Sequence, residues 1–269
     1  MARTLVMGIL NVTPDSFSDG GRFATPAEAV EEARRLIQEG ADIVDIGGES
    51  TRPGAHPVPE DVELERVLPV VEVVALDPRA RVSIDTMKPR VAAACLEAGA
   101  TLINDTSGLR DPEMARIAAA AGAGVVIMHT RGTPLTMREH AVYQDVMREV
   151  IEELRPRVEM AREAGVREIY VDPGIGFAKT PAQSFEILRR LPELAALGCP
   201  ILVGPSRKSF LGVLPGMEEV GARLEGTIAA AVIGAWNGAS IVRVHDVAPV
   251  KKALSVVDAV KGGLWTRSS

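Results

Sequence analysis

The sequence predicts an α/β protein with a single (β/α)8 domain, the TIM barrel, over residues 1–269. A repeated unit carries this prediction: an amphipathic helical stretch, a stop of small residues that includes glycine, and a short β-branched run. Eight such runs alternate with eight helical stretches, which are the numbers of strands and helices in this barrel. No Ser/Gly-rich linker or run of charge divides the chain, so we expect one domain.

The predicted strands are short and almost continuously hydrophobic, as expected when crossover helices bury both faces of a parallel sheet. In chain order they cover residues 4–10, 42–46, 81–84, 101–104, 125–128, 168–171, 201–203 and 240–244. A doubly wound sheet is the alternative, but it normally needs a Gly-rich turn after its first strand. Residues 11–15 read NVTPD instead, which favours the barrel.

The predicted helices lie between these strands. Several are followed by glycine, which adopts the left-handed conformation after a helix without a penalty from Cβ. Others begin with proline near the first turn, where a missing N–H costs nothing. In chain order they cover residues 26–39, 59–76, 88–98, 111–121, 143–164, 181–197, 218–237 and 246–261.

Composition and charge exclude several classes of protein. The net charge of −6 argues against a nucleic-acid partner, which would need a basic face. Two cysteines, Cys95 and Cys199, cannot form a disulfide framework, and we expect both to be small buried residues. The apolar run 5–10 is too short for a signal peptide and the run 227–236 spans half a membrane. We therefore expect a cytoplasmic protein that does not bind membranes.

Polar side chains follow nearly every predicted strand. In a parallel barrel the carboxyl ends of all strands meet at one mouth, where the reactive groups lie. A single polar residue there is ordinarily a helix cap or a turn residue, but their recurrence predicts a functional site. The residues are Asn11, Asp45, Glu49, Asp85, Asn104, Asp105, His129, Asp172, Ser206 to Lys208, Arg243 and His245.

Two connections, 11–25 and 47–58, are long, rich in Gly, Pro, Ser and Thr, and without periodicity. A structureless loop of ~15 residues in a compact domain is usually a lid or a binding loop. We expect both loops to be mobile and to cover the barrel mouth.

The charges of the predicted mouth are of two kinds. One kind is cationic or can become so, and its members on the eighth strand stand where barrels commonly bind phosphate, which indicates an anionic substrate. The other kind suits a heterocycle with several N–H donors, because a carboxylate accepts two parallel hydrogen bonds. The first set is Arg52, Lys208, Arg243 and His245, and the second is Asp85, Asn104 and Asp172.

Other patterns carry little functional weight. Residues 174–180 lack the spacing of a P-loop. We expect Lys179 to be a solvated residue at a helix start, and His129 and His140 lie too far apart for a metal-binding pair. The loop 129–142, in which Arg138 follows Met137, receives no catalytic role.

Seven segments closely resemble the dihydropteroate synthases of folate biosynthesis: 8–21, 45–54, 83–86, 103–105, 172–177, 206–209 and 243–246. The resemblance implies a transferase that condenses 6-hydroxymethyl-7,8-dihydropterin diphosphate with 4-aminobenzoate to 7,8-dihydropteroate and pyrophosphate. Diphosphate loss would give a pterin cation, which the arylamine attacks while both loops exclude water. The resemblance also implies sulfonamides as mimics of 4-aminobenzoate, and a homodimer through apolar faces of late helices.

The resemblance assigns roles to individual residues. It places Asp85, Asn104, Asp172 and Lys208 on the pterin, and Asn11, Arg52, Arg243 and His245 on the diphosphate, with Asn11 also on Mg²⁺. It places Phe17, Thr51, Pro53 and Ser209 around 4-aminobenzoate, and it gives the catalytic roles to Asn11, Asp85, Lys208 and Arg243.

Two rival functions stay open. A methyltetrahydrofolate-binding barrel of the methyltransferase type would share the fold and the carboxylate-rich pocket, but it would not need Phe17, Arg243 or His245. A non-catalytic pterin-binding homologue would not need the full set of polar residues.

Overall fold

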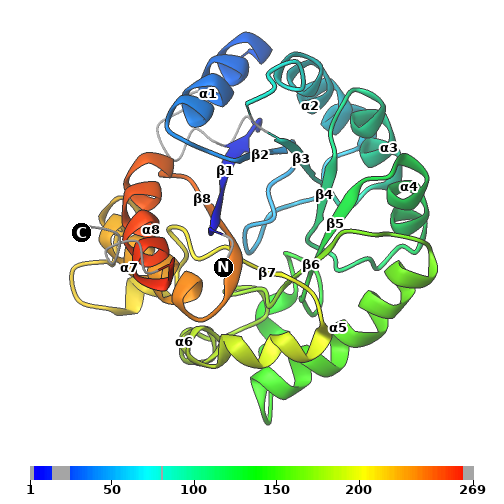
Figure 1. Cartoon of the computed structure of the whole chain (residues 1–269). Helices are drawn as coiled ribbons and strands as arrows, with labels where there is room; N and C mark the ends of the chain where they lie inside the picture. The colour runs from blue at the N-terminus through cyan, green and yellow to red at the C-terminus, as the bar shows by residue number, and fades with distance from the viewer. Residues whose placement is uncertain (1–2, 14–24, 80, 263–269) are drawn as a thin grey trace.

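The structure, a computed structural model, describes residues 3–13, 25–79 and 81–262. Eight parallel strands form a closed barrel in which each strand pairs with the next along the chain and β8 pairs with β1. Figure 1 shows the strands at the centre and the helices around them. The predicted (β/α)8 fold is confirmed.

The strands agree with the prediction to within two residues at each end. Several extend one residue further than expected, because parallel pairing continues to their polar last residues: Asn11 pairs with Gly47, and Gly47 pairs with Asp85. The strands are β1 (Leu5–Asn11), β2 (Ile43–Gly47), β3 (Arg81–Asp85), β4 (Leu102–Asp105), β5 (Gly124–Met128), β6 (Ile169–Asp172), β7 (Ile201–Val203) and β8 (Ala239–Val244).

Every predicted helix is present, with three corrections. The helix expected over 143–164 begins only at Val146, because Asp145 caps its first turn. The helix expected over 181–197 ends at Arg190, and a 3₁₀ segment that holds Pro192 in its first turn replaces the rest. The helix expected over 218–237 starts only at Leu224, because Arg223 donates to the carbonyls of Met217 and Glu218 and holds these residues in a loop. The helices are α1 (Pro26–Gln38), α2 (Glu60–Val74), α3 (Pro89–Glu97), α4 (Glu113–Ala121), α5 (Val146–Glu163), α6 (Pro181–Arg190), α7 (Leu224–Trp236) and α8 (Val247–Gly262), with 3₁₀ segments η2 (Met137–His140), η3 (Leu191–Leu197), η4 (Leu211–Val213) and η5 (Val220–Ala222).

Two apolar layers form the core. The larger one fills the space between the strands and the helices. The smaller one fills the inside of the barrel with side chains that come mainly from the first halves of the strands: Met7, Ile43, Leu102, Val126, Tyr170, Leu202 and Ile241. This inner layer closes the barrel and leaves the carboxyl-terminal mouth to polar side chains.

The structure also bears on the expectations for the two cysteines and for membrane-spanning helices. Cys95 is buried, as expected, whereas Cys199 is only half-buried, because it lies in the loop that precedes β7. No helix within the described ranges has the length and apolarity to cross a membrane.

Candidate active site

Strand alternation selects which polar side chains enter the barrel. Successive side chains of a strand point to opposite faces, so Asp45 lies on the same face as Ile43 of the inner layer, and Asn104 on the same face as Leu102. By the same rule Asp172 lies on the same face as Tyr170, and Arg243 lies on the same face as Ile241. Asp105 points the other way and caps a turn by accepting the N–H groups of Ser107 and Leu109.

Arg243 connects three strands across the barrel. Its Nε donates to Asp45 Oδ2 and its Nη2 donates to Asp85 Oδ2, each over 2.6 Å. Asn104 Nδ2 donates to the same oxygen of Asp45 over 2.9 Å. The two kinds of charge expected at the mouth are therefore in direct contact, since Arg243 is paired with the carboxylates.

Burial changes the protonation of the Asp85 carboxyl at neutral pH. It raises the pKa of Asp85 to about 7, against the opposing effect of Arg243 and with a smaller contribution from the charge of Asp45. Asp85 Oδ1 and Asp45 Oδ1 are buried and have no hydrogen-bond partner within the described part of the chain. Buried acceptors are nearly always satisfied, so these two oxygens are suited to receive N–H donors from a ligand.

Asp172 and Lys208 form a second polar pair in the mouth. Burial raises the pKa of Asp172, whose Oδ1 accepts the N–H of Gly174 over 2.7 Å. Burial lowers the pKa of Lys208 to about 8. Lys208 Nζ donates to the carbonyl of Ile175 over 2.6 Å and lies 4.6 Å from the centre of the Phe177 ring.

Lys208 and Arg243 share one wall of the barrel. A Cβ placed on Gly204 would lie 3.8 Å from Lys208 Nζ and 3.7 Å from Arg243 Cβ. Gly204 therefore lies beside both cations, and the polar residues of β2, β3, β6 and β8 belong to one site.

His245 carries no positive charge at neutral pH. Burial, together with the smaller effects of the cations Arg207 and Arg243, lowers its pKa to about 3. Its Nδ1 lies 3.0 Å from Ser206 Oγ. In the absence of a bound anion the His245 ring therefore acts as a neutral hydrogen-bonding group.

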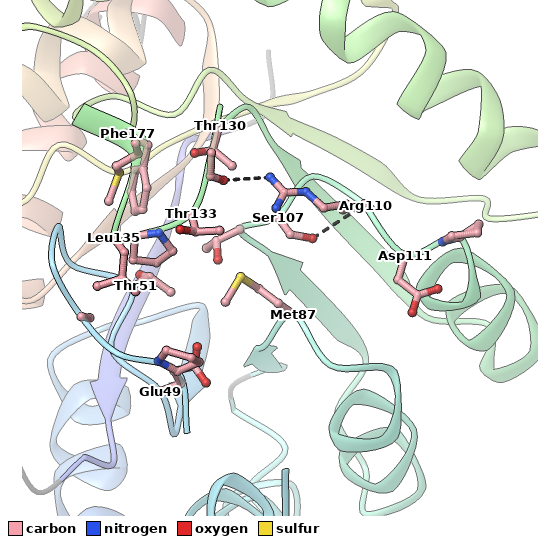
Figure 2. A pocket seen from close by; sticks show the side chains of 17 residues that line it. Glu49, Thr51, Met87, Ser107, Arg110, Asp111, Thr130, Thr133, Leu135 and Phe177 are labelled. Atoms are coloured by element: carbon pink, nitrogen blue, oxygen red, sulfur yellow. Dashed lines mark hydrogen bonds between the residues drawn. The ribbon is translucent and has the colours of Figure 1, made fainter. Parts of the chain in front are cut away.

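A cavity of about 550 Å³ opens beside the polar residues. Figure 2 shows Thr51, Leu135 and Phe177 on one side of it and Arg110 and Asp111 on the other. Phe177 is shared by the cavity and Lys208, so it joins the two parts of the mouth. The lining comes from the loops after β2 to β6: Glu49, Thr51, Ala55, Pro57, Met87, Thr106, Ser107, Arg110, Asp111, Pro112, Thr130, Gly132, Thr133, Pro134, Leu135, Met137 and Phe177.

The loop 47–58 contributes Glu49, Thr51, Ala55 and Pro57 to the lining of the cavity, and that it covers the whole mouth stays a prediction. The Gly54 N–H donates to the carbonyl of Pro134 over 2.8 Å, so the loop reaches the one after β5. Lys88 Nζ is hydrogen-bonded to both Glu49 and Glu63 and anchors the base of the loop. That this loop is mobile stays a prediction.

The residues assigned to the aryl substrate are brought together only in part. Thr51 lines the cavity, whereas Pro53 and Ser209 are exposed and do not. Arg52 is also exposed. Phe17, with the rest of residues 14–24 of the other predicted lid, lies outside the described residues.

Sequence reasoning misjudged Lys179. It is 9% exposed, and its Nζ lies 2.9 Å from His129 Nδ1 and 2.9 Å from the Phe177 carbonyl. The chain turns sharply over residues 174–178 and directs this side chain inward, so it is not a solvated residue. The closely spaced Gly174 and Gly176 before it were the available signal of such a turn.

His129 is not part of a metal site within the described ranges, where no group of three His, Cys, Asp or Glu side chains could hold an ion. Its Nε2 lies 3.1 Å from Glu153 Oε2 on α5. Asp45, which sequence reasoning placed at the mouth without a role, is the shared partner of Arg243 and Asn104.

Comparisons with known proteins agree with this geometry. A family model described as "Pterin binding enzyme" matches residues 7–245. The dihydropteroate synthase of Synechocystis is 46% identical over 96% of this chain and 90% of its own length. A probable bifunctional folylpolyglutamate synthase/dihydropteroate synthase of Haloferax volcanii is 51% identical over 94% of this chain, which spans 30% of that protein.

Solved structures show the same similarity. The dihydropteroate synthase of Yersinia pestis in a sulfonamide complex superposes with a TM-score of 0.92 at 42% identity, over 97% of this chain and 95% of that one. The enzyme of Xanthomonas albilineans with 4-aminobenzoic acid gives 0.89 at 45% identity, over 96% and 93% of the two chains.

Proposed function

This chain belongs to the dihydropteroate synthases, a group of pterin-binding enzymes, and from that membership we propose the chemistry of its barrel mouth. It is a transferase that joins 6-hydroxymethyl-7,8-dihydropterin diphosphate to 4-aminobenzoate and releases pyrophosphate. The observation that carries the proposal is the single cluster of Asp85, Asp172, Lys208 and Arg243, in which buried carboxylates and cations share one mouth.

The pterin ring occupies the acidic part of the cluster. Its lactam N–H and exocyclic amine form a donor edge that a carboxylate accepts in bidentate fashion, and Asp172 fills this role. Lys208 donates to the ring carbonyl or N5, and Asn104 adds a further polar contact. The unpartnered oxygens of Asp45 and Asp85 support this assignment, since a ring without matching acceptors would leave buried polar groups unpaired at about 1–3 kcal/mol each.

The diphosphate lies on the cationic side, near Asn11, Arg52, Arg243 and His245. Arg243 Nη1 makes no hydrogen bond with the described residues, so one nitrogen of this guanidinium is available to an anion. If Ser206 Oγ–H donates to Nδ1 of His245, the neutral imidazole ring carries its proton on Nε2. That N–H can then donate to the diphosphate.

Asn11 is the residue that would hold Mg²⁺. Its amide oxygen is a hard donor at the end of β1, and Mg²⁺ keeps several waters and substrate phosphate oxygens rather than demanding an all-protein cage. The donor set at the mouth therefore fits a magnesium diphosphate. When bound, Mg²⁺ neutralises charge on the leaving group.

The reaction breaks the bond between the methylene carbon and the diphosphate oxygen, and the electron pair leaves with the diphosphate. Asp85 and Asp172 stabilise the positive charge that spreads over the pterin ring, in a site whose dipoles are already oriented. The nitrogen of 4-aminobenzoate then attacks the methylene carbon and releases a proton to solvent. Arg243 stabilises the departing anion.

The second substrate binds between Thr51 and Phe177 in the cavity. Pro53 and Ser209 lie outside the cavity lining, so the family resemblance alone supports their contacts with this substrate, as it does for Phe17. Loops 11–25 and 47–58 exclude the water that would otherwise capture the cation. Because a sulfonamide mimics 4-aminobenzoate, we expect it to compete for this position.

A homodimer forms through α7 and α8. Four large apolar side chains are exposed on these neighbouring helices: Ile233, Trp236, Val256 and Val260. Large apolar side chains exposed on neighbouring helices are candidates for an interface. We place the enzyme in the cytoplasm, where free thiols such as Cys95 and Cys199 are common.

Incubation with Mg²⁺, the dihydropterin diphosphate and labelled 4-aminobenzoate tests the function. We expect labelled dihydropteroate and equimolar pyrophosphate, loss of turnover with a chelator, and recovery with added Mg²⁺. Product without pyrophosphate would indicate another chemistry, such as that of a methyltransferase-type barrel. Binding without product would indicate a non-catalytic pterin-binding protein.

A further inference from the structure

The turn that follows β6 has an unusual backbone. Gly174, Gly176 and Ala178 all adopt positive φ, at +69°, +79° and +47°. Glycine does so freely, but alanine in this region is strained because its Cβ approaches the backbone. A surrounding contact must therefore hold Ala178 in place.

Lys179 provides that contact. Its buried Nζ donates back across Ala178 to the carbonyl of Phe177 over 2.9 Å. On its other side it meets Nδ1 of His129 over 2.9 Å. Burial lowers the pKa of His129 to about 4, so this ring is neutral and Nδ1 can accept the hydrogen bond.

The same turn holds the cation that we place on the pterin. Lys208 Nζ donates to the carbonyl of Ile175 and lies against the ring of Phe177. A Cβ on Gly176 would lie 3.2 Å from Lys208 Cδ, so the turn packs directly on the stem of this lysine. Two lysines thus donate to backbone carbonyls of the same turn, Lys208 to Ile175 and Lys179 to Phe177.

We propose that Lys179 is a positioning residue for this enzyme: with His129 it fixes the turn 174–178, and through Phe177 and Ile175 it sets the place of the Lys208 ammonium. The inference rests on the proposed function, because it assumes that Lys208 binds the dihydropterin. Lys179 itself need not touch a substrate. Its removal frees the Phe177 carbonyl and lets the turn relax, and Lys208 then loses its fixed partners.

A double-mutant cycle tests this coupling. The affinity for 6-hydroxymethyl-7,8-dihydropterin is measured by calorimetry in wild type, Lys179→Met, Lys208→Ala and the double variant, together with kcat/KM wherever turnover is detectable. We expect Lys179→Met to weaken binding about tenfold in wild type and less than twofold in the Lys208→Ala background, since residues that act through each other are not additive. Equal losses in both backgrounds, or wild-type affinity in Lys179→Met, would overturn the inference.

Glu153→Gln is a matched control, because Glu153 contacts His129 but not the turn 174–178. Glu153→Gln alters the outer partner of His129 but leaves both contacts of Lys179, so its dihydropterin affinity should stay within twofold of wild type. Should Lys179→Met fail to fold, Lys179→Gln, which keeps a donor one atom shorter, takes its place in the same cycle. Failure of the wild type to bind the dihydropterin would contradict the proposed function instead.

Discussion

Burial shifts the pKa values of two side chains of the site in opposite directions. It raises the pKa of the Asp85 carboxyl and lowers that of the Lys208 ammonium, so folding disfavours the charged form of both. Ionised groups in such places do not stabilise the fold. Strongly shifted pKa values cluster at functional sites, which supports the proposed contacts of Asp85 and Lys208 with the pterin.

Asp85→Asn and Lys208→Ala should therefore separate activity from stability. We expect kcat/KM to fall about 100-fold or more in each, because each removes a charge aimed at the reacting ring. The melting temperature should change little, since neither charge favours folding. Asp77→Asn, in the loop between α2 and β3, serves as the control with unchanged activity. Near-wild-type turnover of both site variants would refute the pterin-site assignment.

The pH dependence of kcat/KM should be bell-shaped and narrow. Asp85 must be ionised to stabilise the cation, so activity rises as pH increases through its pKa of about 7. Lys208 must be protonated to donate, so activity falls as pH increases through its pKa of about 8. In Asp85→Asn the acidic limb assigned to this carboxyl should disappear. Persistence of that limb would assign it to another group, such as the substrate phosphate.

At the scale of elements, the loops after different strands are in direct contact with one another. Gly174 shows this most clearly: a Cβ there would lie 1.9 Å from the carbonyl oxygen of His129, so the loop after β6 rests on the end of β5. Gly54 and Pro134 join the loops after β2 and β5, and Arg110 donates to the carbonyl of Gly132. The mouth is therefore a connected rim.

Gly174→Ala tests the closeness of this packing. Gly122 adopts a similar φ of +65° but has open space around its Cβ position, so it serves as the matched control. Gly122→Ala should cost about 1–2 kcal/mol for the left-handed conformation alone. Gly174→Ala should cost about 1–3 kcal/mol more from the clash. Urea unfolding measures both, and equal losses would show that the backbone conformation alone matters.

At the scale of the whole molecule, α7 and α8 expose large apolar side chains on the outside of the barrel. Figure 1 shows the two helices side by side on the outside of the barrel. Lys261 on α8 donates to the carbonyl of Ala235 on α7, which fixes one helix against the other. A rigid apolar surface of this kind favours association of two copies.

Ile233→Asp should produce monomers, because it places a charge within the proposed interface on α7. Sedimentation measures the change, with wild type as the dimer. Leu76→Asp is the matched control: this leucine is 81% exposed but lies between α2 and β3, far from α7 along the barrel, and should leave the oligomeric state unchanged. A monomeric wild type would contradict the dimer.

The fold could be predicted because its determinants are local. Runs of β-branched residues, stops such as Gly122 and the start of α6 at Pro181 each act within a few residues of the chain. The helix ends after Arg190 and before Leu224 differ from the prediction and depend on Pro192 and on Arg223, which also donates to the carbonyl of Arg207, 16 residues away. Patterns within a few residues of the chain do not show contacts between distant residues, such as that of Arg223 with Arg207.

The sequence alone determined the barrel and the identity of the mouth, because the carboxyl end of every parallel strand must open on the same side and Asp85, Asp172 and Arg243 stand at those ends. Only the tertiary structure decided which of these charges meet and which forms they take. Arg243 pairs with Asp45 and Asp85, His245 is neutral, and Lys179 is buried. The physical reason is that pairing and protonation depend on the distances and burial created when residues remote in sequence pack together.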